Sequence, residues 1–153
     1  MFCEQLGDAL EEAYRLIAKV ESAMVTNVRG LKLSINELHL LEAVRKGGER
    51  GSTISNIAAR LSITLSSVTV GVNKLEHKGL VVKCRDKSDG RVVLVRLTET
   101  GRKAERVHHR FYRSLACSLS QNVTLQEQRL LLNSLRDINQ FLRIKARKME
   151  AKK

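Results

Sequence analysis

The residues best suited to binding chemistry lie on one side of a helix predicted from Thr64 to about Gly79. At 100° per residue its apolar residues fall on one face, and the opposite face is polar. Asparagine can pair with adenine, lysine with guanine or phosphate, serine with bases or phosphates, and valine can contact a thymine methyl. The alternative interpretation is a merely solvated face. The candidate DNA-binding residues of this segment are Thr64, Ser66, Ser67, Val70, Asn73, Lys74 and His77.

A basic tip lies between two runs rich in β-branched residues, 80–84 and 92–97, and this pattern predicts a β-hairpin. The tip turns at Gly90 and carries three basic residues. Narrow A·T-rich minor grooves attract arginine, so such a tip is suited to bind there. Alternatively, the charges protect an exposed edge strand from aggregation. The basic residues are Arg85, Lys87 and Arg91.

Helices must hold these two surfaces in place. A short helix at 54–61, with Thr53 as its N-cap, is followed by a three-residue turn and then the polar-faced helix, which is the arrangement of a helix-turn-helix. The remaining predicted helices are 4–28, 34–46 with capping-box spacing at Ser34 and Glu37, one from Thr98, and 124–149. The fold class is therefore mainly α with a small β-hairpin (α+β), a winged helix-turn-helix with long flanking helices.

Charge and composition narrow the function. The 153 residues have a net charge of +12, which favours a polyanion as partner. They contain no proline, which favours long helices. The sequence contains no Gly-rich phosphate loop, zinc-protease motif or nucleophile elbow, so we expect no enzyme activity and no cofactor. It also contains no transmembrane run or secretory signal, and its three isolated cysteines are typical of reduced thiols. We therefore expect a cytoplasmic protein without a membrane partner.

The segment from Ile57 to Arg102 resembles the DNA-binding core of the MarR family of bacterial transcriptional regulators. Two motifs carry the resemblance, Asp-x-Arg at Asp89–Arg91 and Leu-Thr-x-x-Gly at Leu97–Gly101. The resemblance implies a homodimer on double-stranded DNA, with two recognition helices in successive major grooves of a pseudo-palindromic operator. It also implies that Arg91 enters the minor groove while Asp89 orients the wing arginines. Gly90 stands where many members have a second arginine, which implies a more flexible tip and a weaker contact.

The same resemblance implies one MarR-like domain over 1–153. Residues 33–100 are expected to form the winged helix-turn-helix lobe. Residues 1–30 and 101–150 are expected to form an intertwined helical dimerisation region.

Within the family, segments such as SINELHLLEAV and ERVHHRFYRSL most resemble the branch that represses fatty-acid biosynthesis genes in Gram-positive bacteria. Members of that branch bind DNA more tightly when a long-chain acyl group on acyl carrier protein docks on them. This implies a basic stripe on which acyl carrier protein docks. Alternatively, the stripe is a solvated face or contacts DNA phosphate. Its residues are Arg102, Lys103, Arg106, Arg110 and Arg113. It also implies a region that binds the effector. Alternatively, the apolar residues of this region belong only to the hydrophobic core. The residues are Met24, Leu38, His39, His108 and Phe111.

Other regulators and another class of protein remain as alternatives. A zinc sensor is possible if His39, Glu42 and His108 cluster, because only one of the adjacent His108 and His109 can face a given site. A thiol sensor would use Cys3, and a small aromatic ligand is a further candidate effector. A non-specific architectural protein would keep the basic charge but show little sequence preference.

Overall fold

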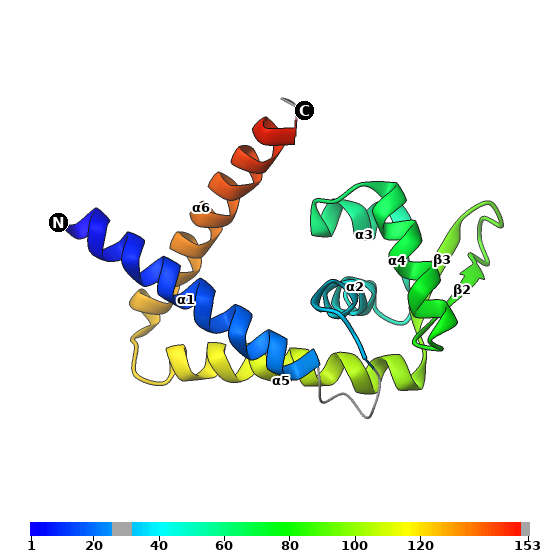
Figure 1. The fold of residues 1–153 in the computed structure, drawn as a ribbon, viewed down its shortest axis with the longest axis horizontal. Helices are drawn as coiled ribbons and strands as arrows, with labels where there is room; N and C mark the ends of the chain where they lie inside the picture. Colours follow the sequence, from blue (N-terminus) through cyan, green and yellow to red (C-terminus); the bar gives the residue numbers. More distant parts are fainter. Residues whose placement is uncertain (26–31, 151–153) are drawn as a thin grey trace. The chain divides into compact units, whose positions relative to one another are not determined.

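The computed structural model describes residues 1–25 and 32–150. The chain divides into two compact units, Met1–Arg110 and Phe111–Lys153. The elements in chain order (Figure 1) are α1 (Phe2–Val25), α2 (Ile35–Arg45), β1 (Ser52–Thr53), α3 (Ile54–Leu61), α4 (Leu65–His77), β2 (Val81–Arg85), β3 (Val93–Leu97), α5 (Glu99–Ser120) and α6 (Leu125–Glu150). The predicted helix 4–28 corresponds to α1, and its last predicted residues, 26–28, lie outside the described residues.

The first unit is built on a core shared by α2, α3, α4 and a small sheet. Apolar residues from these elements form one buried cluster, which includes Leu41, Ile57, Val72 and Val95, each at 0% exposure. Burial of such side chains supplies the main driving force for this packing. The core therefore fixes α4 and the sheet relative to each other.

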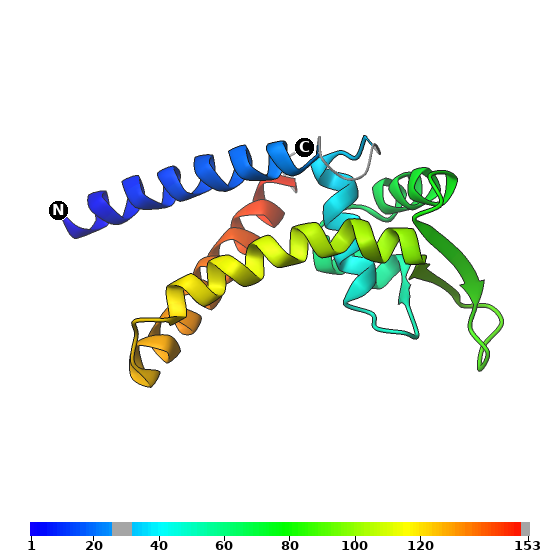
Figure 2. The same ribbon diagram turned by 90° about the horizontal axis from the view of Figure 1, so that it is seen from below.

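The sheet has three antiparallel strands in the order β1-β3-β2, one more than the predicted hairpin. Strand β1 is only two residues long and pairs Ser52 with Val95 and Thr53 with Leu94. A strand of two residues is too short to show the alternating pattern from which strands are predicted. Strands β2 and β3 pair from Val81 opposite Leu97 to the loop, and the hairpin projects away from α3 and α4 (Figure 2).

Side-chain caps begin the helices where the sequence predicts them. The Ser34 backbone N–H donates to Glu37 at 2.8 Å, and the Glu37 N–H donates to the Ser34 hydroxyl at 3.2 Å, which completes a capping box. Thr53 caps α3 and Thr64 caps α4 in the same manner. Between them the chain turns at Ser62, whose φ of 55° lies in the left-handed region. These caps confirm the predicted helix-turn-helix.

The Leu-Thr-x-x-Gly motif connects the start of α5 to the turn that follows α4. The Thr98 hydroxyl donates to the Gly79 carbonyl at 2.7 Å, and the Thr98 N–H donates to the Leu80 carbonyl at 3.0 Å. A Cβ on Gly101 would overlap the Leu80 carbonyl oxygen, so only glycine lets α5 approach this closely. The motif is thus a packing device rather than a binding site.

Apolar side chains remain exposed along α1 and along α6. On α1, Leu6, Leu10 and Val20 lie along one face, the apolar seam of this helix, and are 44%, 45% and 40% exposed. On α6, in the second unit, Leu135 and Leu142 are 51% and 55% exposed. In the described part of the chain, no helix combines the length and the apolar character needed to cross a bilayer.

Candidate nucleic-acid interface

The exposed face of α4 carries the side chains predicted to read DNA. Val68, Val72 and Leu75 are fully buried at 0% exposure, and they anchor the opposite face in the core. The predicted set is exposed on the other side, as the helical period requires. These exposed residues are Ser66, Ser67, Val70, Asn73, Lys74 and His77.

Three hydroxyl groups gather at the N-terminus of α4. The Thr64 hydroxyl oxygen accepts a hydrogen bond from the Ser67 backbone N–H at 3.2 Å. It also lies 3.0 Å from the Ser66 hydroxyl and 2.8 Å from the Ser67 hydroxyl. The partial positive charge of a helix N-terminus and its N–H groups favour an anion such as phosphate. Thr64 therefore acts as the cap, and the two serines remain exposed beside it.

Asn73 belongs to a polar network that sequence reasoning missed. Lys83 of β2 donates from Nζ to Asn73 Oδ1 at 2.5 Å and to Glu76 Oε2 at 2.7 Å. This hydrogen bond from Lys83 also lowers the pKa of the Glu76 carboxyl. The contact leaves the Asn73 amide N–H groups as donors and a second lone pair on its oxygen, which is the pattern needed to pair with adenine. No spacing rule links residues 73 and 83, because they meet only through the packing of β2 on α4.

The wing residues Arg85, Lys87, Asp89 and Arg91 are all exposed on the β2–β3 hairpin. Asp89 Oδ1 accepts the backbone N–H of Arg91 at 3.0 Å, and the Asp89 carbonyl accepts the N–H of Val92 at 3.0 Å. Asp89 therefore shapes the turn through the backbone. In this structure it orients Arg91 through the main chain and not through the guanidinium group.

A different carboxylate, that of Asp86, holds an arginine at the base of the wing. Asp86 accepts hydrogen bonds from the Ser88 hydroxyl at 2.6 Å and from the Ser88 N–H at 2.8 Å, and it pairs with Arg50 at 2.8 Å. These bonds hold the pKa of the Asp86 carboxyl well below its ordinary value. Arg50 comes from the loop after α2, and its carbonyl accepts from Arg96 of β3 at 2.9 Å. The wing is thus braced at its base while its tip is free to meet DNA.

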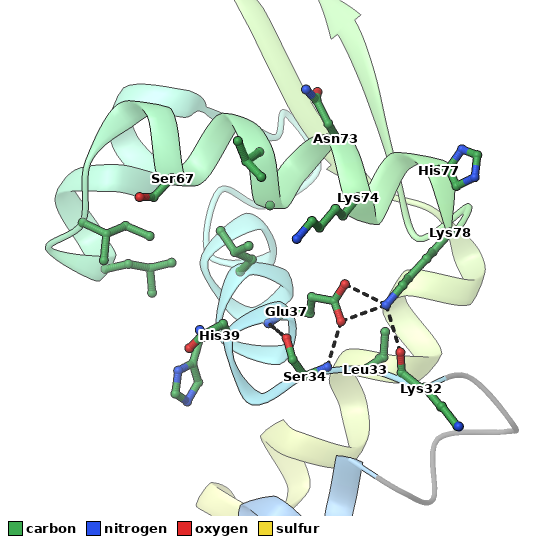
Figure 3. A pocket seen from close by; sticks show the side chains of 16 residues that line it. Lys32, Leu33, Ser34, Glu37, His39, Ser67, Asn73, Lys74, His77 and Lys78 are labelled. Atoms are coloured by element: carbon green, nitrogen blue, oxygen red, sulfur yellow. Dashed lines mark hydrogen bonds and ion pairs between the residues drawn. The ribbon is translucent and has the colours of Figure 1, made fainter.

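A groove of about 1090 Å³ separates the exposed side of α4 from α2 (Figure 3). Lys78 closes one end, where it donates to the Lys32 carbonyl at 2.9 Å and to Glu37 at 2.7 and 2.9 Å. Burial acts to raise the pKa of Glu37, but the hydrogen bonds from Lys78 and Ser34 outweigh it, and the pKa lies below its ordinary value. Five of the candidate DNA-binding residues line this groove: Ser67, Val70, Asn73, Lys74 and His77.

The predicted effector residues differ in their burial and in the unit to which they belong. Leu38 is 1% exposed and belongs to the core cluster. Met24 is half-buried, and Phe111 lies at the start of the second unit, with its ring against Tyr112 at 5.0 Å. His39 and His108 do come together, and both contact Glu21 of α1, which sequence reasoning did not single out.

Of the other two residues considered for a metal, His109 faces solvent, whereas Glu42 lies near His39 and His108 but pairs with a lysine. His109 is exposed, while its neighbour His108 is buried, as adjacent helical positions require. Glu42 pairs with Lys46 at 2.6 Å. The candidate thiol Cys3 is exposed near the start of α1, and Cys84 and Cys117 are free as well.

The predicted basic stripe on α5 is exposed at every position, although two of its members already have partners. Arg102 donates to the Leu97 carbonyl at 3.0 Å, and Lys103 pairs with Glu99 at 2.6 Å. Arg106 and Arg110 are exposed on the same helix, and Arg113 is exposed in the second unit. Arg106 and Arg110 therefore expose positive charge on the first unit, and Arg113 does so on the second.

Comparison with known proteins agrees with this arrangement. Residues 26–106 match the family of SarA/Rot transcriptional regulators. The chain belongs to this family, which has the MarR-type winged-helix fold. An 85-residue segment is 33% identical to YdgJ of Bacillus subtilis (strain 168), an uncharacterised HTH-type transcriptional regulator. That segment is 53% of this chain and 49% of YdgJ, so the chain spans about half the length of this relative.

Solved structures extend the likeness to nearly the whole chain. Streptococcus pneumoniae FabT in complex with DNA is 27% identical, with a TM-score of 0.76 over 91% of this chain and 96% of FabT. MarR from Oenococcus oeni PSU-1, at 17% identity and a TM-score of 0.70 over 88% of this chain and 98% of that one, shares the fold. Family and fold together make the chain a transcriptional regulator of the MarR type. Its relatives are regulators and not enzymes, which confirms the expectation that it is not an enzyme.

Proposed function

We propose that this regulator binds a pseudo-palindromic operator as a homodimer, with α4 in the major groove and the tip of the wing in the minor groove. The observation that carries the proposal is the exposed polar face of α4 beside the basic wing. A single α-helix fits the major groove, and donors and acceptors on its outer face can read base edges. The wing tip adds Arg85, Lys87 and Arg91 for the phosphates and the minor groove.

The exposed apolar seams of α1 and α6 support the homodimer. Long helices that keep large apolar side chains in water are unfavourable, and a second copy of the chain is the partner that can bury both seams at once. Under this proposal, residues 1–30 and 101–150 form the dimerisation region and residues 33–100 form the DNA-binding lobe. Two lobes related by two-fold symmetry would then meet half-sites about 34 Å apart.

We further propose that the regulated genes are those of fatty-acid biosynthesis and that long-chain acyl carrier protein is the effector. The sequence resemblance to the fatty-acid branch and the fold shared with FabT support this assignment. Acyl carrier proteins are acidic, and Arg106 and Arg110 expose positive charge on α5. The effector would act by binding the DNA-competent state more tightly than the other state.

A fluorescence-anisotropy titration tests both the operator proposal and the effector proposal. The protein is titrated onto DNA from fatty-acid-synthesis promoters and onto a scrambled duplex, with and without long-chain acyl carrier protein. We expect tighter binding to the promoter than to the scrambled duplex, by a factor on the order of 10³ or more. The acyl species should tighten promoter binding further. The double variant Arg106→Ala/Arg110→Ala should lose that response, whereas Arg129→Ala/Arg136→Ala on α6 should keep it.

The outcomes separate the alternatives. Equal affinity for promoter and scrambled DNA would favour an architectural protein and reject the operator proposal. Specific binding that ignores the acyl species would keep the operator proposal and reject the effector. A metal, a thiol oxidant and a small aromatic ligand would then be tested in the same assay.

A further inference from the structure

Three arginines from three different elements line one pocket at the C-terminal end of α2. The pocket has a volume of about 510 Å³, and its basic residues are Arg45 of α2, Arg96 of β3 and Arg102 of α5. All the residues that line it belong to the first unit, so the pocket is a feature of one compact body. Tertiary packing brings the three arginines together, because no local sequence pattern links their positions.

Each guanidinium group is held by one hydrogen bond that leaves other donors available. Arg45 donates from Nε to the Glu105 carboxylate at 2.6 Å, and Arg96 donates from Nε to the carbonyl of Arg50 at 2.9 Å. Arg102 donates from Nη1 to the last carbonyl of β3 at 3.0 Å. A guanidinium group has five N–H donors. Among the described residues nothing else accepts from these three groups, so both terminal amino groups of Arg45 and Arg96 remain available to a ligand.

Positive charge exceeds negative charge in this pocket. Among the described residues that line it, Glu49 is the only acid, and it is exposed. Glu105 pairs with Arg45, but its side chain is 2% exposed and does not line the pocket. Glu99 lies near Arg102 but already pairs with a lysine on its own helix. Like charges that share one pocket repel each other, so a bound anion would offset this repulsion.

We propose that this arginine pocket binds the phosphate group of a small phosphorylated molecule. Arginine donates paired, parallel N–H bonds to an oxyanion, and such charge-assisted bonds are stronger than neutral ones. The volume of about 510 Å³ lies in the range of small-molecule sites. Val44, which is 1% exposed, and Leu97 add apolar surface beside the arginines for the rest of the molecule. The ligand class is therefore an organic phosphomonoester.

The position of the arginine pocket favours a free ligand over a phosphate of DNA. The groove beside α4 is lined by α2 residues between 36 and 40, whereas the arginine pocket is lined by Val44 and Arg45, at the end of that helix. Among the described residues that line it, none belongs to α4, to the wing tip 86–91 or to the predicted effector region. The proposal therefore depends neither on the operator nor on acyl carrier protein.

Calorimetric titration of the full-length protein with phenyl phosphate, at constant ionic strength in a phosphate-free buffer, tests the site. We expect saturable binding of one molecule per chain. Arg96→Ala and Arg102→Ala should each weaken it by about 10–100-fold, because each removes hydrogen bonds to a charged group. Arg45 stays in place, since its removal would leave the buried Glu105 carboxylate unpaired. Arg60→Ala, at an exposed position on α3 outside the pocket, removes the same charge and should bind like the wild type.

A conservative variant separates hydrogen-bond geometry from charge. Arg102→Lys keeps the positive charge but not the paired donors, so its affinity should lie between those of the wild type and Arg102→Ala. Circular dichroism and thermal unfolding without ligand should show that both variants are folded, because Arg102 is exposed. Phenyl phosphate should raise the unfolding temperature of the wild type more than that of Arg102→Ala. Equal affinity in the wild type, Arg96→Ala and Arg102→Ala, or binding that does not saturate, would overturn the site.

Titrations onto DNA separate the two sources of a phosphate group. The slope of log affinity against log salt is measured by anisotropy for the wild type and for Arg102→Ala. We expect equal slopes, because the pocket holds a free molecule and not the DNA backbone. A slope lowered by about one unit in Arg102→Ala would place a DNA phosphate in the pocket and overturn the proposal. Failure of the wild type to bind any duplex would count against the proposed DNA function instead, and calorimetry alone would then decide the pocket.

Discussion

Arg91 is the residue at which the wing meets DNA most directly in our proposal. Arg91→Ala should weaken binding by a similar factor across DNA sequences and lower the slope of log affinity against log salt by about one unit, because one phosphate-type contact is lost. Anisotropy titrations at several salt concentrations measure both. The control Lys19→Ala removes one positive charge from α1 and should leave the slope unchanged. An unaltered slope for Arg91→Ala would show that the wing tip stays off the DNA.

Asn73 differs from Arg91 because its amide carries no charge and can pair with adenine through one donor and one acceptor. Asn73→Ala should cost about 1–3 kcal/mol on the operator and relax the preference at one base pair per half-site. Lys83→Met leaves the amide in place but removes its 2.5 Å hydrogen bond, so it should reduce the preference at the same base pair by less. Binding to a panel of single-base-pair operator variants measures the effect. A uniform loss over the panel would place Asn73 on the backbone.

Glu37 contributes stability that depends on pH. Its pKa in the folded protein lies below the ordinary 4.5, so its contribution is present above pH 4.5 and is lost as the pH falls through the folded value. Glu37→Gln keeps a capping-box side chain but removes the charge that pairs with Lys78. The wild type should therefore be more stable than Glu37→Gln at about pH 7, and the difference should shrink at a low pH, as the pH falls through the folded pKa of Glu37.

Urea unfolding at the two pH values measures that difference. Glu49→Gln, at an exposed carboxylate after α2, provides the control and should match the wild type at both. A gap that persists at low pH would mean that the effect of Glu37 is steric and not electrostatic.

At the scale of elements, the close approach of α5 to the Leu80 carbonyl gives a sharp test of packing. Gly101→Ala places a Cβ against backbone that has no room for it, and we expect a loss of about 1–3 kcal/mol in unfolding free energy. Gly7→Ala is the matched control, since nothing lies within 4 Å of the added Cβ on α1. Alanine should stabilise that helix by about 0.5–1 kcal/mol. Opposite signs in denaturant unfolding would confirm the expectation, and equal effects would contradict it.

The elements that sequence reasoning predicted well are those specified by local rules. Caps at Ser34, Thr53 and Thr64 act over three residues, and helical periodicity fixes which face of α4 is buried. Strand β1 was not predicted because it has only two residues and pairs with β3, about forty residues away. Its existence depends on tertiary packing and not on its own composition.

The distinction between local rules and tertiary packing also applies to the candidate nucleic-acid interface. The exposed residues of α4 and the wing followed from periodicity, but the partners that orient them did not. Lys83 reaches Asn73, and Arg50 reaches Asp86, across separations that no spacing rule covers. Glu21 joins His39 and His108 for the same reason. A single sequence shows which side chains face outward, whereas folding decides which of them meet.

At the scale of the whole molecule, the exposed seam of α6 tests the homodimer. Leu135→Asp should shift the protein from dimer to monomer, because a charge in an apolar interface has no partner. Operator affinity should fall by a factor on the order of 10² or more, since the second half-site is no longer linked to the first. Gln140→Asp, on the opposite face of α6, should leave both properties unchanged. Light scattering and anisotropy give the two measurements, and a wild-type monomer would reject the proposal.

The attachment of Thr98 and Gly101 to the Gly79–Leu80 turn has a consequence for how affinity and sequence preference are related. Because the start of α5 is bonded to the end of α4 and the start of β2, a rotation of α5 carries the recognition helix and the wing together. In the proposed dimer, each lobe would then keep its own contacts while its distance from the partner lobe changes. An effector that acts in this way would strengthen or weaken binding to all operators alike and leave the ranking of those operators intact.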